Sequence, residues 1–183
     1  MKALIIILLV VAAMWCAGHM ILVAVAAPAI FLHAVSTPIP QFDHLSRELA
    51  GAIFGDILQR WNVAINSGFL PLVGVLLIAL GGVLFQRKRI AMMVVCGLTL
   101  VSIAGVHGWS DAILSEARAT APPVDPSISY SVEQRHIFND LHKRSTMLYG
   151  TEAMLLLLLV IGCGVALGRQ ADAVSPSALP PAH

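Results

Sequence analysis

Apolar residues form four long runs along the chain, and polar residues collect in the segments between them. The first run extends from Ala3 to Leu32 after a single basic residue, Lys2. About 20 apolar residues are enough to cross the hydrocarbon of a bilayer, so each run is long enough for a membrane-spanning helix. The pattern predicts four spans, at about 4–32, 61–85, 90–113 and 146–168. They form one domain over 1–169, followed by a disordered cytoplasmic tail over 170–183.

The start of the first run also has features of a secretory signal peptide, with one basic residue followed by an apolar core. The run continues well past the length of such a core. Met14 and Trp15 also stand before Cys16, where a lipoprotein cleavage site needs small residues. We therefore expect a retained helix.

The segments between the runs predict two further features. Pro38 and Pro40 interrupt helix, because the residue before a proline is disfavoured in the helical region. An amphipathic pattern over 43–60 then predicts an interfacial helix that continues into the second span. Ser131 and Gln134 have the spacing of a capping box, so a fourth helix is expected from Val132 to Gly168, about 55 Å long and longer than the membrane is thick.

The amino-acid composition also indicates a protein whose surface is surrounded by lipid. The 183 residues are 58% hydrophobic and 11% charged, whereas ordinary soluble domains carry about 25% charged residues. A net charge of +1 gives no electrostatic basis for nucleic-acid binding. We predict an all-α integral membrane four-helix bundle, with an amphipathic helix before span 2 and a long fourth helix.

Basic residues in short segments predict the orientation. Lys2, the turn Arg87-Lys88-Arg89 and Arg169 fall on one side with almost no acidic residues nearby. Basic residues on the other side are spread over two longer loops and are matched by acidic residues. By the positive-inside rule, both termini and the 86–89 turn are expected in the cytoplasm, which for a bacterial chain means insertion in the inner membrane.

Four features resemble one family of four-span membrane proteins, those similar to human transmembrane protein 205, whose bacterial members form an uncharacterised domain family. The spacing of the spans is one of them. The other three are motifs: Ala27-Pro28-Ala29-Ile30-Phe31, Ala50-Gly51-x-x-Phe54-Gly55 and Phe138-x-x-Leu141-His142-x-x-Ser145. The resemblance implies fold and membrane location, with Pro28, Phe31, Gly51, Gly55, Phe138, Leu141, His142 and Ser145 as the family-like positions. It implies no particular activity.

Polar side chains inside the spans fall at one depth. Measured from the cytoplasmic end of each span by helix rise, His19, His107 and Glu152 lie about 22–25 Å up, and Asn66 lies about 28 Å up. Ionisable residues inside a bilayer usually face the bundle interior and mark functional sites. One hypothesis is a His19–His107–Glu152 cluster, completed by His142 at the outer mouth, that binds copper or zinc or relays protons.

Other interpretations of the same residues stay open. The cluster is also explained by interhelical hydrogen bonds that only fix packing. Glu152 at the membrane interface, reaching the headgroups near Tyr149, is a third interpretation. His19 and His107 as axial haem ligands are a fourth, although nothing else in the sequence supports haem.

Small residues four apart indicate where helices approach closely. The pairs Gly51/Gly55 and Gly164/Gly168 predict tight helix packing or, alternatively, contact with a second copy or a membrane partner. No nucleotide-binding, nucleophile-elbow or zinc-protease motif is present, so no catalytic residue is assigned and an enzyme is not expected. The sequence favours a non-enzymatic membrane protein in metal or stress handling. A structural or accessory subunit of a membrane complex is the rival hypothesis, and a haem-binding electron carrier is a further alternative.

The predicted orientation is testable with reporter fusions placed after residue 88 and after residue 125. Because a single span separates these points, a cytoplasmic reporter is expected to be active only at the first and an exported reporter only at the second. Equal cytoplasmic signal at both would exclude the four-span topology.

Overall fold

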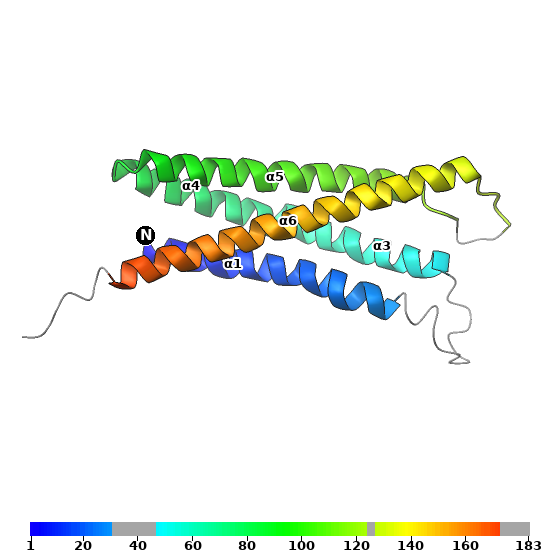
Figure 1. Cartoon of the computed structure of the whole chain (residues 1–183), viewed down its shortest axis with the longest axis horizontal. Coiled ribbons are helices and arrows are strands. Elements are labelled where there is room, and N and C mark those ends of the chain that lie inside the picture. The colour runs from blue at the N-terminus through cyan, green and yellow to red at the C-terminus, as the bar shows by residue number, and fades with distance from the viewer. Residues whose placement is uncertain (31–46, 124–126, 173–183) are drawn as a thin grey trace, which may run out of the picture.

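The computed structural model describes residues 1–30, 47–123 and 127–172, and over these residues the chain is helical with no strand (Figure 1). The elements in chain order are α1 (Lys2–Ile21), η1 (Leu22–Ala26), α3 (Arg47–Ala64), η2 (Ile65–Phe69), α4 (Leu70–Gln86), α5 (Ile90–Ala119) and α6 (Val132–Asp172). Here η denotes a π-helix. Four helical rods are long and apolar enough to cross a membrane: Lys2–Ile30, Leu49–Gln86, Ile90–Ala119 and Val132–Gln170.

Two π-helical turns lie just before prolines in the rods. Proline has no backbone N–H, so a proline inside a helix leaves the carbonyl four residues earlier without its usual partner. The π-helix η1 ends two residues before Pro28, and η2 ends two residues before Pro71. In a π-helix the hydrogen bonds span five residues instead of four, which widens the turn locally. Both rods therefore continue through their prolines.

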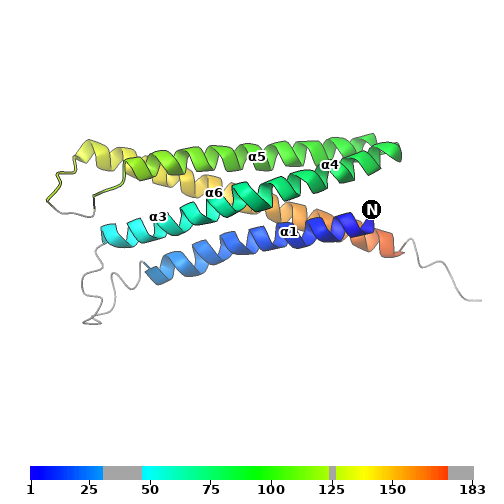
Figure 2. The same ribbon diagram turned by 180° about the vertical axis from the view of Figure 1, so that it is seen from behind.

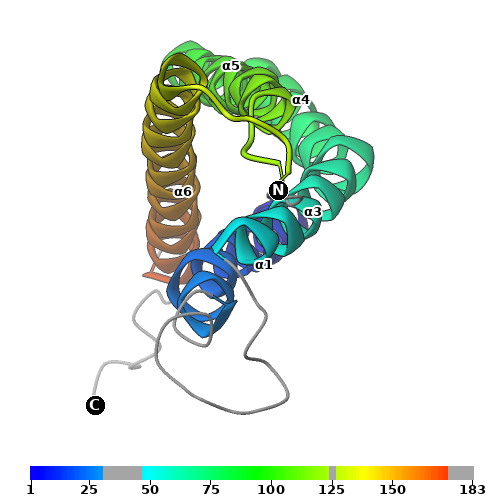
Figure 3. The same ribbon diagram turned by 90° about the vertical axis from the view of Figure 1, so that its right-hand side faces the viewer.

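The four rods form a ring in which each packs against two neighbours. α1 contacts α6 and α4, and α5 contacts α4 and α6. Viewed end-on, α1, the α3–α4 rod, α5 and α6 make the four sides of this ring (Figure 3). From behind, α3 and α4 form one continuous rod that runs beside α1 (Figure 2). The N-terminus, the α4–α5 turn and the end of α6 lie at the same end of the bundle (Figure 1).

The turn between α4 and α5 is as short as its sequence predicts. Lys88 has φ of 56°, in the left-handed region, and its backbone N–H donates to the Phe85 carbonyl at 2.8 Å. The Arg89 N–H donates to the Leu84 carbonyl at 2.9 Å. These bonds use carbonyls that the end of α4 leaves free, so the chain reverses within Arg87–Arg89.

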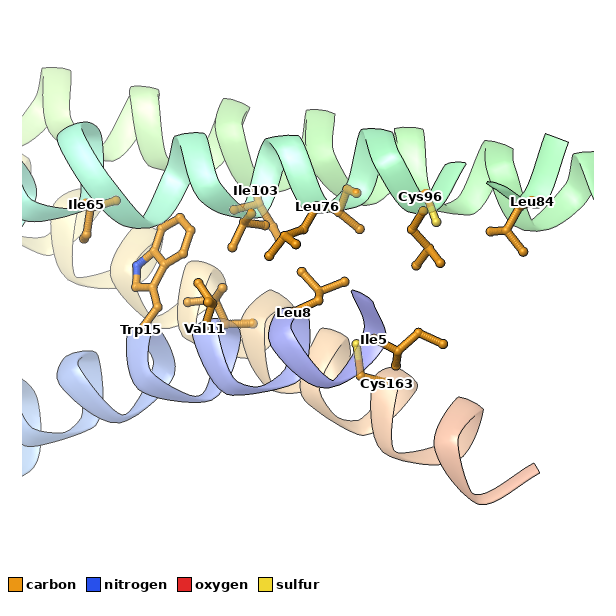
Figure 4. Packing of buried hydrophobic residues seen from close by; sticks show 14 residues of the cluster. Ile5, Leu8, Val11, Trp15, Ile65, Leu76, Leu84, Cys96, Ile103 and Cys163 are labelled. Carbon is orange, nitrogen blue, oxygen red and sulfur yellow. The ribbon is translucent and has the colours of Figure 1, made fainter. Parts of the chain in front are cut away.

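Apolar side chains fill the half of the bundle nearest this turn (Figure 4). Leu8 of α1 is 1% exposed, and Val73 of α4, Ile103 of α5 and Leu156 of α6 are fully buried. Each rod thus contributes to one core. Many other large apolar side chains of the rods, such as Val101 at 70% exposure, face outward, as expected of helices surrounded by lipid.

The fold confirms the all-α four-helix bundle, and some helix bounds differ from those expected. The helix that begins at Arg47 continues without a break into the second span, as predicted, and the predicted residues 43–46 lie outside the described residues. α5 continues to Ala119 rather than ending near residue 113, because Ile113 and Ala117 pack against Leu141 of α6. α6 ends at Asp172, so helix covers the first residues of the expected tail, and 173–183 lie outside the described residues.

The closest helix approach is at Gly18 of α1. A Cβ atom added there would overlap the six-membered ring of Trp61 on α3. The two glycine pairs expected to pack tightly do not make such contacts: a Cβ added at Gly51, Gly164 or Gly168 meets nothing within 4 Å. At Gly55 it meets only the Arg118 side chain, at 3.7 Å. The expectation of close packing through these pairs within the chain was therefore wrong.

We expect Gly18→Ala to destabilise the bundle by about 1–3 kcal/mol, the usual cost of overpacking. The new methyl group would displace Trp61, so the tryptophan fluorescence spectrum should shift as well. Gly105→Ala is the matched control, because a Cβ there meets nothing within 4 Å. Unfolding of both variants in detergent micelles measures the difference. Equal stability of the two variants would contradict the contact.

Candidate functional site

Three ionisable side chains from three rods meet inside the bundle. Glu152 of α6 is fully buried, His107 of α5 is 1% exposed and His19 of α1 is 2% exposed. The sequence placed these residues at one depth, and the structure brings them into contact. Glu152 does not reach the bundle surface, so the interpretation that it lies at the headgroups is wrong.

The carboxylate of Glu152 lies between the two histidine rings. His107 Nδ1 is 3.1 Å from Oε1 and 3.3 Å from Oε2, close enough to donate to either oxygen. His19 Nε2 lies 3.5 Å from Oε1, in contact with the carboxylate but without a hydrogen bond to it. We call Glu152, His107 and His19 the Glu152 cluster.

Two contacts of His19 Nδ1 require different proton arrangements. Nδ1 lies 3.3 Å from the Trp15 carbonyl oxygen, to which it bonds only as an N–H donor. The indole Nε1 of Trp61 lies 3.4 Å from the same atom and needs it as an acceptor. When Trp61 donates, the proton of neutral His19 is on Nε2, which faces Glu152. When His19 is an imidazolium, Trp61 loses its partner. Whether Nδ1 of His19 carries a proton, in the imidazolium or in one neutral tautomer, thus decides which contact is kept.

Aromatic rings surround the cluster and separate it from lipid. Trp15 lies edge-on to His107 with ring centroids 5.9 Å apart, and Trp61 lies edge-on to His19 at 5.9 Å. The Tyr149 ring is 5.4 Å from His19. Among the described residues, four buried polar atoms have no hydrogen-bond partner, and all belong to this region: Trp15 Nε1, His19 Nε2, His107 Nε2 and Ser110 Oγ.

A hydrogen-bonded chain of polar side chains begins one helical turn from Glu152. The Tyr149 hydroxyl donates to Asn62 Oδ1 at 2.6 Å, and Asn62 Nδ2 donates to Asp111 Oδ1 at 2.7 Å. Asn66 Nδ2 lies 3.3 Å from Asp111 Oδ2. The chain ties α3, η2, α5 and α6 together. The hydrogen bonds of two asparagines to Asp111 were not predicted from the sequence.

The remaining residues singled out from the sequence lie apart from the cluster. His142 is exposed and stacks on Phe138 with centroids 5.9 Å apart. It precedes Glu152 by ten residues on α6, or about 15 Å, so it does not complete the cluster. Of the other family-like positions, Leu141 and Ser145 are buried in α6 and Pro28 is exposed, whereas Phe31 lies outside the described residues.

From the sequence, His19, His107, Glu152 and His142 were expected to bind copper or zinc. Within 1–30, 47–123 and 127–172, no group of three or more His, Cys, Asp or Glu side chains is arranged so that it could hold a metal ion. A haem between the two histidines does not fit either, because the Glu152 carboxylate occupies the space between their ring nitrogens. The geometry is that of a buried carboxylate hydrogen-bonded to one histidine and in contact with a second.

We expect Tyr149→Phe to destabilise the bundle by about 1–3 kcal/mol, since it leaves the buried Asn62 oxygen without its donor. Tyr130→Phe is the matched control, because the Tyr130 hydroxyl bonds to the Thr120 and Gln134 carbonyls near the protein surface. Its effect should be below about 1 kcal/mol. Unfolding in detergent micelles compares them, and an equal loss would argue against a buried Tyr149–Asn62 bond.

The comparisons with known proteins identify no relative. No family model matches the chain, and neither the curated proteins nor the solved structures give a significant match. Membership of the four-span family named above therefore stays a prediction.

Proposed function

We propose that the protein is a four-span integral membrane protein, with both termini in the cytoplasm, whose Glu152 cluster binds and releases a proton. The resemblance to the transmembrane protein 205-like family is consistent with this membrane location. The observation that carries the proposal is the complete burial of Glu152 between two histidines. A proton-binding role is one of the two chemistries expected from these residues, and the geometry supports it better than metal binding.

Charge balance is the first argument. An ionised Glu152 flanked by two neutral histidines leaves a net charge of −1 in an apolar core. An unneutralised charge there costs several kcal/mol. One additional proton, on a histidine or on the carboxyl group, makes the cluster neutral. The neutral cluster is therefore favoured, and its charge changes only when a proton is gained or lost.

The contacts of His19 are the second argument. Nδ1 has a carbonyl acceptor when it carries a proton and an indole donor when it does not. Both protonation states of the ring therefore have a hydrogen-bonded partner nearby. Such a site loads and unloads with small side-chain movements, and the movement includes the indole of Trp61.

The test is an infrared and fluorescence titration of the purified protein in lipid nanodiscs. We expect a carboxyl or imidazolium band that changes with pH, together with a change in Trp61 fluorescence. Glu152→Gln should abolish both changes, because the amide takes up no proton itself and no longer supplies the negative charge that favours a protonated histidine. Glu116→Gln, at an exposed position near the end of α5, should leave them intact. Identical titrations of wild type and Glu152→Gln would refute the proposal.

Metal analysis and an absorption spectrum of the same preparation separate proton from metal binding. We expect no stoichiometric copper, zinc or iron, and no difference between wild type and His19→Ala. If the wild-type protein contains a bound metal that His19→Ala loses, the site binds a metal ion and the proton proposal is refuted.

A further inference from the structure

The polar side chains around the Glu152 cluster continue toward one end of the bundle only. Tyr149 lies three residues before Glu152 on α6 and its ring packs against His19. Its hydroxyl bonds to Asn62, and Asn62 and Asn66 both bond to Asp111. All of these residues lie on the side away from the basic α4–α5 turn, where the chain passes from α5 to α6.

The members of this series nearest the cluster are buried, and the last member is exposed. Glu152 is fully buried, and Asn62 and Tyr149 are 3% and 7% exposed. Asp111 is half-buried, and Asn66 is exposed. The series therefore begins at the cluster and ends at the bundle surface. Hydroxyl, amide and carboxylate groups at each step can solvate water or an entering proton.

Among the described residues, the opposite end of the bundle has no charged side chain in its core, and of its hydroxyl and amide side chains Thr99 is half-buried and Ser102 and Gln86 are exposed. Between the cluster and the basic turn, the rods carry no Asp, Glu, Lys, Arg or His over 3–18, 70–86, 90–106 and 153–168. The core there is packed by apolar side chains from all four rods (Figure 4). Its buried members include Leu8, Val73, Leu77, Leu80, Leu84 and Ile103.

A proton entering such a core meets the full desolvation penalty of a charge in a medium of low dielectric constant. Several turns of helix separate the cluster from the basic end: from Glu152 to Gly168, for instance, the distance is about 24 Å at the α-helical rise. This packed segment is a barrier much thicker than one side chain.

We propose that the Glu152 cluster exchanges protons with only one side of the bilayer, the side reached by Asp111. This inference rests on the proposed function and adds the side of the membrane with which the protons are exchanged. Loading moves one proton from hydronium in that compartment to a nitrogen or oxygen of the cluster. Release returns the same proton to water on the same side. The protein then reports the acidity of one compartment and does not conduct protons across the membrane.

We call the series of polar side chains from Glu152 to Asn66 the route. The titratable and polar groups along it come from all four rods. α1 contributes His19, α5 contributes His107, Asp111 and Arg118, and α6 contributes Glu152 and Tyr149. The second rod contributes Trp61, Asn62 and Asn66, and its Asp56 and Arg60 pair with each other on the surface. Among the described residues, the basic turn and its neighbouring helix ends lie across the apolar core from all of these.

The experiment uses the full chain in sealed vesicles of neutral phospholipid with known insertion direction. The pH is stepped on one side at a time while tryptophan fluorescence is recorded. We expect a response to the step on the Asp111 side and none to an equal step on the side of the basic turn. With a pH dye inside the vesicles and a pH gradient imposed, the proton flux should equal that of protein-free vesicles.

Two variants separate the possible failures. Glu152→Gln should lose the response on the Asp111 side, and a response that survives in this variant refutes the proposed function itself. Asn66→Leu, at an exposed position, removes a polar group from the route and should slow the response without changing its final amplitude. Equal responses from both sides, or proton flux above the protein-free level, would overturn one-sided exchange while leaving the proton site in place.

Discussion

The burial of the Glu152 carboxylate is the interaction on which the structure most depends. A carboxylate with no access to water needs nearby groups that supply protons or positive charge. One helix alone cannot provide them on both sides. α1 and α5, which are not neighbours in the ring, each direct a histidine at the same carboxylate from α6. The three rods are therefore fixed in depth and rotation relative to one another at this level.

The π-helical turns and the glycine contact adjust the rods around this level. η1 begins three residues after His19, and η2 begins three residues after Asn62. Each π-helical turn rotates the residues that follow it about the helix axis. The side of the rod that faces the bundle interior can therefore be polar before the turn and apolar after it. Gly18 lets the Trp61 ring lie directly against α1, where it reaches His19. Local backbone features thus serve the packing of one polar layer.

Helix rise predicts depth, and this explains which parts of the site were visible in the sequence. His19, His107 and Glu152 fall at similar heights in separate spans, and the structure joins them. The rotation of each helix about its own axis, relative to the other helices, cannot be calculated from residue spacing in this way. The hydrogen bonds of Asp111 and the contact of Trp61 with Gly18 depend on rotation between distant segments, so the sequence pattern gave no signal for them.

The same limit explains the wrong predictions. Glycines four residues apart mark a face on which another helix can approach, but among the described residues nothing lies within 4 Å of a Cβ built at Gly164 or Gly168. His142 shares a helix with Glu152, yet it lies about 15 Å away along the axis. Four spans and an all-helical fold follow from composition and run length alone, because the bilayer leaves few other ways to satisfy the backbone.

The free energies of hydrogen bonding and of charge burial favour the proposed proton-binding role of the cluster over a purely structural role. Interhelical hydrogen bonds in membrane proteins contribute about 0.6 kcal/mol each on average. Burying a carboxylate costs several kcal/mol before its partners offset the penalty. An amide or hydroxyl at position 152 would provide interhelical hydrogen bonds without that cost. What a carboxyl group between two imidazoles adds is a proton that can be gained and lost, and the packing around it then serves to hold that exchange at one depth.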